Sequence, residues 1–128
     1  MDVTQIGLFA LADKRLAWLD RRQEVLAHNV ANADTPGWRP RDLGPFAATL
    51  SATGGIAPVQ TRPNHLPGTQ AATAPAVVER PSERAPDGNA VSMQEQLMKV
   101  ANTESSQELV TNLYTKYLGF FRLALGHS

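Results

Sequence analysis

Apolar residues recur along the first part of the chain at alternating spacings of three and four positions. The series runs through Phe9, Ala12, Leu16, Leu19, Gln23, Leu26, Val30 and Ala33, and every member except Gln23 is apolar. This is the heptad pattern of a helix that packs along one narrow stripe. A helix of ~30 residues reaches about 45 Å, which is too long to bury its stripe alone. We therefore expect residues 1–35 to form one half of a coiled-coil domain.

A second helical pattern lies at the other end of the chain. Ser92-Met93-Gln94-Glu95 fits a capping box, in which the serine hydroxyl accepts the N3 amide and the glutamate reaches back. Apolar positions follow in two groups, Leu97, Val100 and Ala101, then Val110, Leu113, Tyr117, Phe120 and Ala124. The intervening residues 102–108 are polar, and the two groups do not share one register. We expect a C-terminal helix over 92–126 that contains a stutter or contacts another chain there.

These two helices are predicted to pair as a coiled coil, because each has an apolar stripe that needs a partner. The expected seam consists of Phe9, Leu16, Leu19, Leu26 and Val30 from the first helix and Val110, Leu113, Tyr117 and Phe120 from the second.

The middle of the chain has a different composition. Eight of the nine prolines lie between residues 39 and 91, at positions 40, 45, 58, 63, 67, 75, 81 and 86. Few large apolar residues accompany them, so this segment cannot form a core alone and is expected to be largely extended or disordered. A short helix is expected at 43–50, where Leu43, Phe46 and Leu50 share a face. The predicted fold class is mainly α, with a turn and a Pro/Ala/Thr-rich connector over 36–91.

The stretch HNVANADTPGW predicts a sharp end to the first helix. Thr35 precedes a proline and is pushed out of the α region, and Pro36-Gly37 suits the centre of a type II turn. The helix should therefore end near Ala33 or Asp34. The amides of Asn29 and Asn32 can donate to the last helix carbonyls or to a neighbouring chain. Periodicity alone favours ordinary turn chemistry over a recognition element.

Length and charge narrow the class of protein. With 128 residues, 12 Lys+Arg and 12 Asp+Glu, the chain is compatible with one domain and lacks the basic patch that nucleic-acid binding needs. It has no cysteine, which excludes disulfides and thiolate metal sites. No apolar run approaches the ~20 residues of a membrane span. Asp2 precedes the first apolar run and Lys14-Arg15 follows it, the reverse of a secretory signal. Export would therefore use a route without a cleaved signal peptide.

The sequence gives no support for an enzyme, a cofactor or a metal site. His28, His65 and His127 are isolated from one another, and Ser105-Ser106 has no positioned base nearby. Gly54-Gly55 lacks the lysine and the strand–helix context of a phosphate loop. No catalytic, cofactor-binding or metal-binding residue is predicted.

The helix-ending motif resembles the signature of bacterial flagellar axial proteins, the rod, hook and hook-associated subunits. Their N-terminal helix ends in an Ala-Asn-x-x-Thr-Pro-Gly-aromatic turn. The matching residues here are Asn29, Ala31, Asn32, Thr35, Pro36 and Gly37, with Trp38 in place of the usual tyrosine.

Further motifs are similar to those of the proximal rod proteins within that family. They are the Arg41-Asp42 pair, the TRPNHL element with Thr61, His65 and Leu66, and the entry to the C-terminal helix at Asp87, Gly88, Asn89 and Val91. The polar ESSQ at 104–107 departs from the bulkier family pattern. Other proximal rod proteins share the first motif and remain an alternative.

The resemblance implies a structural subunit of the flagellar proximal rod. Such a protein would be exported unfolded through the flagellar type III apparatus and polymerised into a hollow helical tube between the membrane ring and the distal rod. Its expected partners are copies of itself, other rod proteins, and the membrane-ring and rod-adaptor proteins of the basal body. The competing hypothesis is a cytoplasmic two-helix adaptor or regulator, which leaves the Thr-Pro-Gly turn and the long connector unexplained.

Overall fold

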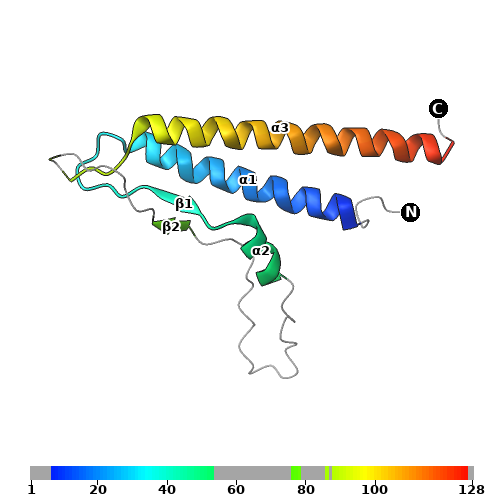
Figure 1. Cartoon of the computed structure of the whole chain (residues 1–128), viewed down its shortest axis with the longest axis horizontal. Helices are drawn as coiled ribbons and strands as arrows, with labels where there is room; N and C mark the ends of the chain where they lie inside the picture. Colours follow the sequence, from blue (N-terminus) through cyan, green and yellow to red (C-terminus); the bar gives the residue numbers. More distant parts are fainter. Residues whose placement is uncertain (1–6, 54–75, 79–85, 87, 127–128) are drawn as a thin grey trace, which may run out of the picture.

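The computed structural model of the chain is mainly helical, with a long helix at each end (Figure 1). It describes residues 7–53, 76–78, 86 and 88–126. The elements in chain order are α1 (Gly7–Ala31), β1 (Arg41–Leu43), α2 (Phe46–Thr53), β2 (Ala76–Val78) and α3 (Met93–Ala124). Helices α1 and α3 lie side by side and run in opposite directions, so the start of α1 and the end of α3 are at the same end of the pair. Within the described residues, no helix has the length and apolar character needed to cross a membrane.

Helix α1 is buried on a wider arc than one stripe. Phe9, Leu19 and Leu26 are buried as the heptad pattern predicts, but Trp18 and Val25, one position before Leu19 and Leu26, are buried too. Trp18, Leu19, Val25 and Leu43 form one cluster, against which Phe46 and Val110 pack. The reason is that β1 and α2 cover a second face of α1, which periodicity does not reveal.

Helix α3 faces α1 through one continuous register, without a stutter. Gln96 and Thr103 are almost fully buried. The ring of Phe9 lies 4.9 Å from that of Tyr114 and 5.8 Å from that of Phe121, centre to centre. With Val110 these positions form the α3 seam, defined here as Gln96, Thr103, Val110, Tyr114 and Phe121.

The polar stretch 102–108 is compatible with this register because its side chains find partners. The Thr103 hydroxyl donates to the Lys99 carbonyl at 2.8 Å. Gln107 Nε2 donates to Asp20 Oδ1 at 2.5 Å, across the helix pair. A seam position can therefore be polar when a hydrogen bond offsets its burial.

The middle of the chain departs from the expected pattern at Leu43. Residues 41–43 form a short strand that pairs antiparallel with β2, with Arg41 opposite Val78 and Leu43 opposite Ala76. The short helix begins only at Phe46, since Pro45 disfavours α conformation at Gly44. Residues 54–75 and 79–85 of the connector lie outside the described residues.

Strand β1 and helix α2 are held against α1 by polar contacts. Arg22 donates to both carboxylate oxygens of Asp42, at 2.8 and 2.7 Å. Trp18 Nε1 donates to the Gly44 carbonyl at 3.2 Å. The Arg15 guanidinium lies 4.8 Å from the ring centres of both Trp18 and Phe46, a cation–π geometry.

The amide of Asn29, near the end of α1, joins three elements. Its Nδ2 donates to the Arg41 carbonyl at 2.6 Å and to Gln96 Oε1 at 2.8 Å. Its Oδ1 accepts from the Arg41 backbone N–H at 3.0 Å. The Asn29 amide thus pairs with both backbone groups of Arg41, as a residue of a neighbouring strand would. It also forms a hydrogen bond to α3 through Gln96.

We predict that Asn29→Ala lowers the free energy of unfolding by about 2–3 kcal/mol, because the backbone groups of Arg41 and the Gln96 amide lose their partner. Urea denaturation followed by circular dichroism measures this. The matched control is Asn32→Ala. The Asn32 amide bonds the exposed end of its own helix, so we expect a loss of about 1 kcal/mol, the net worth of an ordinary hydrogen bond. Equal losses in the two variants would contradict the role given to Asn29.

We also predict a pH-dependent contribution from the Arg22–Asp42 pair. Burial raises the pKa of Asp42, but the hydrogen bonds and charge of Arg22 outweigh it, so the pKa of Asp42 lies below its ordinary value. A carboxyl group whose pKa is lowered in the folded state stabilises the fold at pH values above about 4, its ordinary pKa. This contribution is lost as the pH falls through the lowered pKa.

Asp42→Asn should therefore cost about 2 kcal/mol near neutral pH, with the difference from the unmodified chain shrinking below about pH 4. Urea denaturation at several pH values measures both quantities. Glu24→Gln, which breaks the exposed Arg21–Glu24 pair, should cost under about 1 kcal/mol. A cost for Asp42→Asn that stays constant down to pH 2 would refute the linkage.

Candidate functional site

The turn that follows α1 is built by Asn32 and Thr35. Asn32 Nδ2 donates to the His28 carbonyl at 2.8 Å, which satisfies one of the last helix carbonyls. Asn32 Oδ1 accepts from the Thr35 hydroxyl at 3.2 Å, and the Thr35 N–H donates to the Asn32 carbonyl at 3.0 Å. α1 ends at Ala31, earlier than the expected Ala33 or Asp34, because the Ala33 N–H turns to the Val30 carbonyl.

The Thr-Pro-Gly segment then reverses the chain. The Trp38 N–H donates to the Thr35 carbonyl at 3.2 Å, so Pro36 and Gly37 occupy the two central positions of the turn. Gly37 has a φ of 73°, which the third residue of a type II turn requires and which side chains disfavour. Thr35, Pro36 and Gly37 are all exposed. The turn is therefore firmly formed and accessible to a partner.

The entry to α3 packs directly on this turn, although it lies about fifty positions later in the chain. The Ala90 N–H donates to the Trp38 carbonyl at 3.2 Å. The Asn89 amide donates to the Ala33 carbonyl, and Asn89 Oδ1 accepts from the Val91 N–H at 3.1 Å. Two motifs singled out separately in the sequence thus form one structure. Asp87 lies outside the described residues, as do Thr61, His65 and Leu66 of the TRPNHL element.

Ser92 caps the first turn of α3 and accepts the Glu95 N–H, as the capping-box pattern indicates. The Glu95 carboxylate instead lies 3.1 Å from Lys99 Nζ.

A pocket of about 270 Å³ lies beside the turn. It is lined by Arg21, Glu24, Val25, His28, Asn29, Trp38 and Arg41. Trp38 Nε1 is buried without a hydrogen-bond partner among the described residues. Over that same part of the chain, no three His, Cys, Asp or Glu residues are grouped as metal ligands would be.

The predicted seam residues do not all meet. Leu16 and Val30 of α1 are half-buried, as is Val110 of α3. Leu113, Tyr117 and Phe120 are 45%, 42% and 64% exposed. The seam of α3 therefore lies one position further along than expected at Tyr114 and Phe121. Gln96 and Thr103 precede Val110 by fourteen and seven residues, so they share its register, and the difference arises after Val110, where the seam steps by four residues to Tyr114 and not by three to Leu113.

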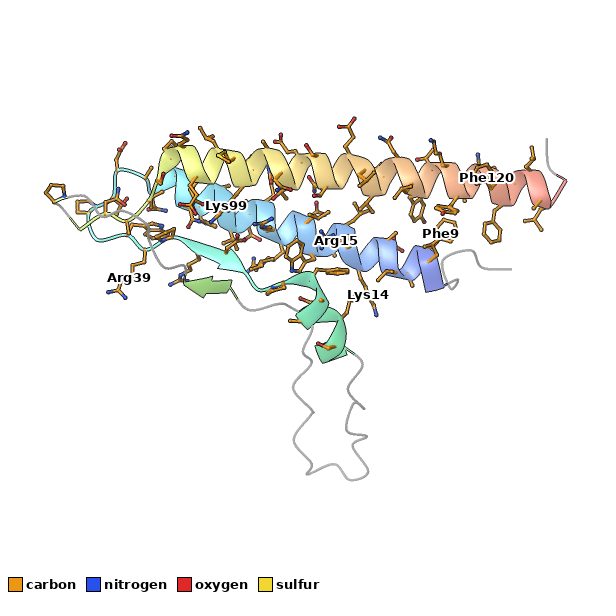
Figure 2. The ribbon with its side chains drawn as sticks, viewed as in Figure 1. Phe9, Lys14, Arg15, Arg39, Lys99 and Phe120 are labelled. Carbon is orange, nitrogen blue, oxygen red and sulfur yellow. The ribbon has the colours of Figure 1, made fainter. Side chains whose placement is uncertain are left out.

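Two of these exposed side chains, Leu113 and Tyr117, line an open groove between α1 and α3. The groove has a volume of about 190 Å³, and is lined by Leu8, Phe9, Leu11, Ala12, Arg15, Val110, Leu113, Tyr114 and Tyr117. Figure 2 shows Phe9 and Phe120 near the end of the helix pair where α1 begins and α3 ends. The apolar repeat in the sequence included Leu113, Tyr117 and Phe120, but their exposure could not be read from it.

Comparison with known proteins identifies the chain's relatives. Residues 12–39, from within α1 through Arg39, match a family model described as Flagella basal body rod protein. The flagellar basal body rod protein FlgB of Agrobacterium fabrum is 32% identical, with 88% of this chain and 87% of the relative covered. FlgB of Salmonella typhimurium is 35% identical, with 83% and 84% covered. FlgB of Escherichia coli is 36% identical, with 70% and 71% covered.

The matched segment contains the whole helix-ending turn, and the relatives are covered over most of their length. The chain belongs to the FlgB family of flagellar basal body rod proteins.

Proposed function

We propose that this chain, a flagellar basal body rod structural protein by family, forms the wall of a hollow helical tube. In this proposal α1 and α3 pair as a coiled coil, and the polymer connects the membrane ring to the distal rod. The observation that carries the proposal is the row of large apolar side chains that the helix pair leaves in solvent. Leu109, Leu113, Tyr117, Phe120 and Leu123 of α3 are between 42% and 80% exposed.

Exposed apolar surface of this kind favours assembly. Single exposed apolar residues are ordinary, whereas a contiguous row indicates a surface that another molecule covers. When the contact joins two different surfaces of the same subunit and its rotation does not close, repetition produces a helical polymer. Subunit contacts would then supply the burial that one helix pair lacks.

The composition of the seam supports export in an unfolded state. Asn29, Gln96 and Thr103 occupy buried positions where apolar side chains would contribute more to stability. We infer that the isolated subunit is only marginally stable, and that it passes unfolded through the flagellar type III apparatus without a cleaved signal peptide. Folding would be completed on assembly in the periplasmic part of the rod.

The exposed turn at Thr35–Gly37 is proposed to meet a neighbouring subunit. It is held from both sides, by Asn32 and by the Ala90–Trp38 hydrogen bond, so it can bind without ordering a loop first. The partners would be copies of this chain, other rod proteins, and the membrane-ring and rod-adaptor proteins of the basal body.

Mass spectrometry of purified hook–basal bodies from the source bacterium tests the proposal, with cytosol as the control. We expect peptides of this chain to be enriched in the rod-containing particles. Detection in the cytosol alone would overturn the proposal and favour a two-helix adaptor.

We predict that Leu16→Pro abolishes swimming and removes the chain from the rod-containing particles. Proline in the middle of α1 removes a hydrogen bond and breaks the helix, at a cost of about 3 kcal/mol or more. Swimming in soft agar and immunoblots of the particles provide the measurements. Leu16→Ala is the matched control, since it keeps the helix and only trims a half-buried side chain. A Leu16→Pro strain that swims normally would rule out the coiled-coil assembly.

A further inference from the structure

One surface of the helix pair, near the end where α1 begins and α3 ends, is predominantly apolar. Its centre is the groove between the two helices, which Leu113 and Tyr117 line from α3. The ring of Phe120 lies 6.2 Å from that of Tyr117, centre to centre, and continues the surface along α3. This surface is named the open face. Its large side chains, which are between 42% and 80% exposed, are Leu8, Leu11, Leu113, Tyr117, Phe120 and Leu123.

Two cations adjoin the open face. Lys116 is exposed and lies three residues after Leu113, four before Phe120 and seven before Leu123. These are the spacings of residues on one side of a helix, so Lys116 is on the same side of α3 as the apolar row. Arg15 lines the groove from α1. Within the described residues, neither cation forms an ion pair with a carboxylate.

Charge is distributed unevenly along the helix pair. The end with the open face, residues 7–19 and 109–126, has one acidic residue, Asp13, and four basic residues, which are Lys14, Arg15, Lys116 and Arg122. The other end, residues 20–34 and 93–108, has six acidic and three basic residues. The antiparallel pairing of α1 and α3 brings the basic residues of two distant segments to one end (Figure 1). An anionic surface would therefore attract this end and repel the other.

Apolar residues bordered by basic ones are typical of helices that lie in the interface of a lipid bilayer. The stems of Lys and Arg extend along apolar surface while their charges reach the headgroups. Tyr117 has an apolar ring and a polar hydroxyl, which suits the same boundary. A protein partner would need an acidic border around an apolar ridge of matching shape, whereas an anionic bilayer supplies negative charge and apolar depth together.

We propose that the open face binds the surface of an anionic phospholipid bilayer. The apolar side chains enter the boundary between headgroups and acyl chains, and Lys116 and Arg15 lie at the level of the headgroups. The helix pair rests on the membrane with its long axis along the surface. Assembly into the proposed tube would cover the same row of side chains, so the membrane holds the subunit before assembly and releases it on assembly.

Flotation with vesicles tests this proposal. The purified full-length chain is mixed with vesicles of equal parts phosphatidylglycerol and phosphatidylcholine, or of phosphatidylcholine alone. The floated fraction is measured by immunoblot over a range of lipid concentrations. We expect the chain to float with the anionic vesicles and to bind the neutral ones at least about tenfold more weakly, because two cations face the membrane. Equal binding to both kinds of vesicle would overturn the proposal.

A charge reversal tests the orientation of the bound chain. Lys116→Glu should lower the partition constant for anionic vesicles about 30-fold, because it removes an attractive charge and adds a repulsive one, each worth about fivefold near such a surface. The matched control is Arg39→Glu, which makes the same change at an exposed position at the opposite end of the helix pair (Figure 2). Its loss should be under about threefold. Equal losses in the two variants would refute the proposed orientation, since they would report net charge alone.

An apolar truncation tests insertion into the membrane. Phe120→Ser should weaken binding by about tenfold or more, because an aromatic side chain no longer leaves water. Met98→Ser is the matched control, since Met98 is exposed to a similar degree, 67% against 64%, near the start of α3. We expect its binding to be unchanged. If circular dichroism shows that Phe120→Ser loses helix, Leu123→Ser reports on the same face, and an unchanged affinity in that variant would contradict insertion.

Coverage of the open face by protein alone is the competing outcome. In that case the chain forms dimers or filaments without vesicles, Phe120→Ser abolishes them and no chain floats, which would overturn the membrane contact. Failure of this inference is distinguishable from failure of the proposed function. Enrichment in rod-containing particles without flotation removes only the membrane contact. Flotation of a chain that is found in the cytosol alone removes the rod assembly and leaves the membrane contact standing.

Discussion

The arrangement of this chain depends on the Asn29 amide, which bonds both β1 and α3 from a buried position near the end of α1. A buried amide is costly unless its donors and acceptor are satisfied, and here both sides of the amide have partners. The Arg41 backbone supplies two of the three bonds in the manner of an adjacent strand. The third bond, to Gln96, holds the start of α3 at the same level. The Asn29 side chain thus holds in place both β1, the strand that follows the turn, and the first turns of α3.

The turn and the helix entry follow from that anchor. Asn32 and Thr35 end α1, and Gly37 reverses the chain. Asn89 and Ala90, which lie just before α3, then donate hydrogen bonds to Ala33 and Trp38 on either side of the turn. The family motif therefore performs two tasks. Its first asparagine joins elements that are distant in sequence, and its second asparagine with Thr35 shapes a local turn. The turn is exposed, while its own geometry is already determined by these bonds.

The polar residues in the seam lower the stability of the isolated helix pair, which is compatible with a subunit that completes its burial on assembly. Gln96 and Thr103 occupy buried positions, while large apolar side chains such as Leu113 and Phe120 are exposed beside the helix pair. An isolated subunit loses burial by this arrangement. An assembling subunit gains surface for contacts with its neighbours. The groove near Phe9 is open, and Leu113 and Tyr117 of α3 line it.

Sequence alone predicted the two long helices, the motif that ends the first of them and the serine that caps the second. These features depend on local spacing and on the chemistry of a few adjacent residues, so they can be read from the chain. The tertiary structure decided the rest. Trp18 and Val25 are buried because β1 and α2 cover α1, the three-residue strands exist because Asn29 and Arg22 hold β1 in place, and the α3 register follows polar pairs formed across the helices. Each of these contacts joins residues far apart in sequence, and a hydrogen-bond partner at that distance leaves no trace in hydrophobic periodicity.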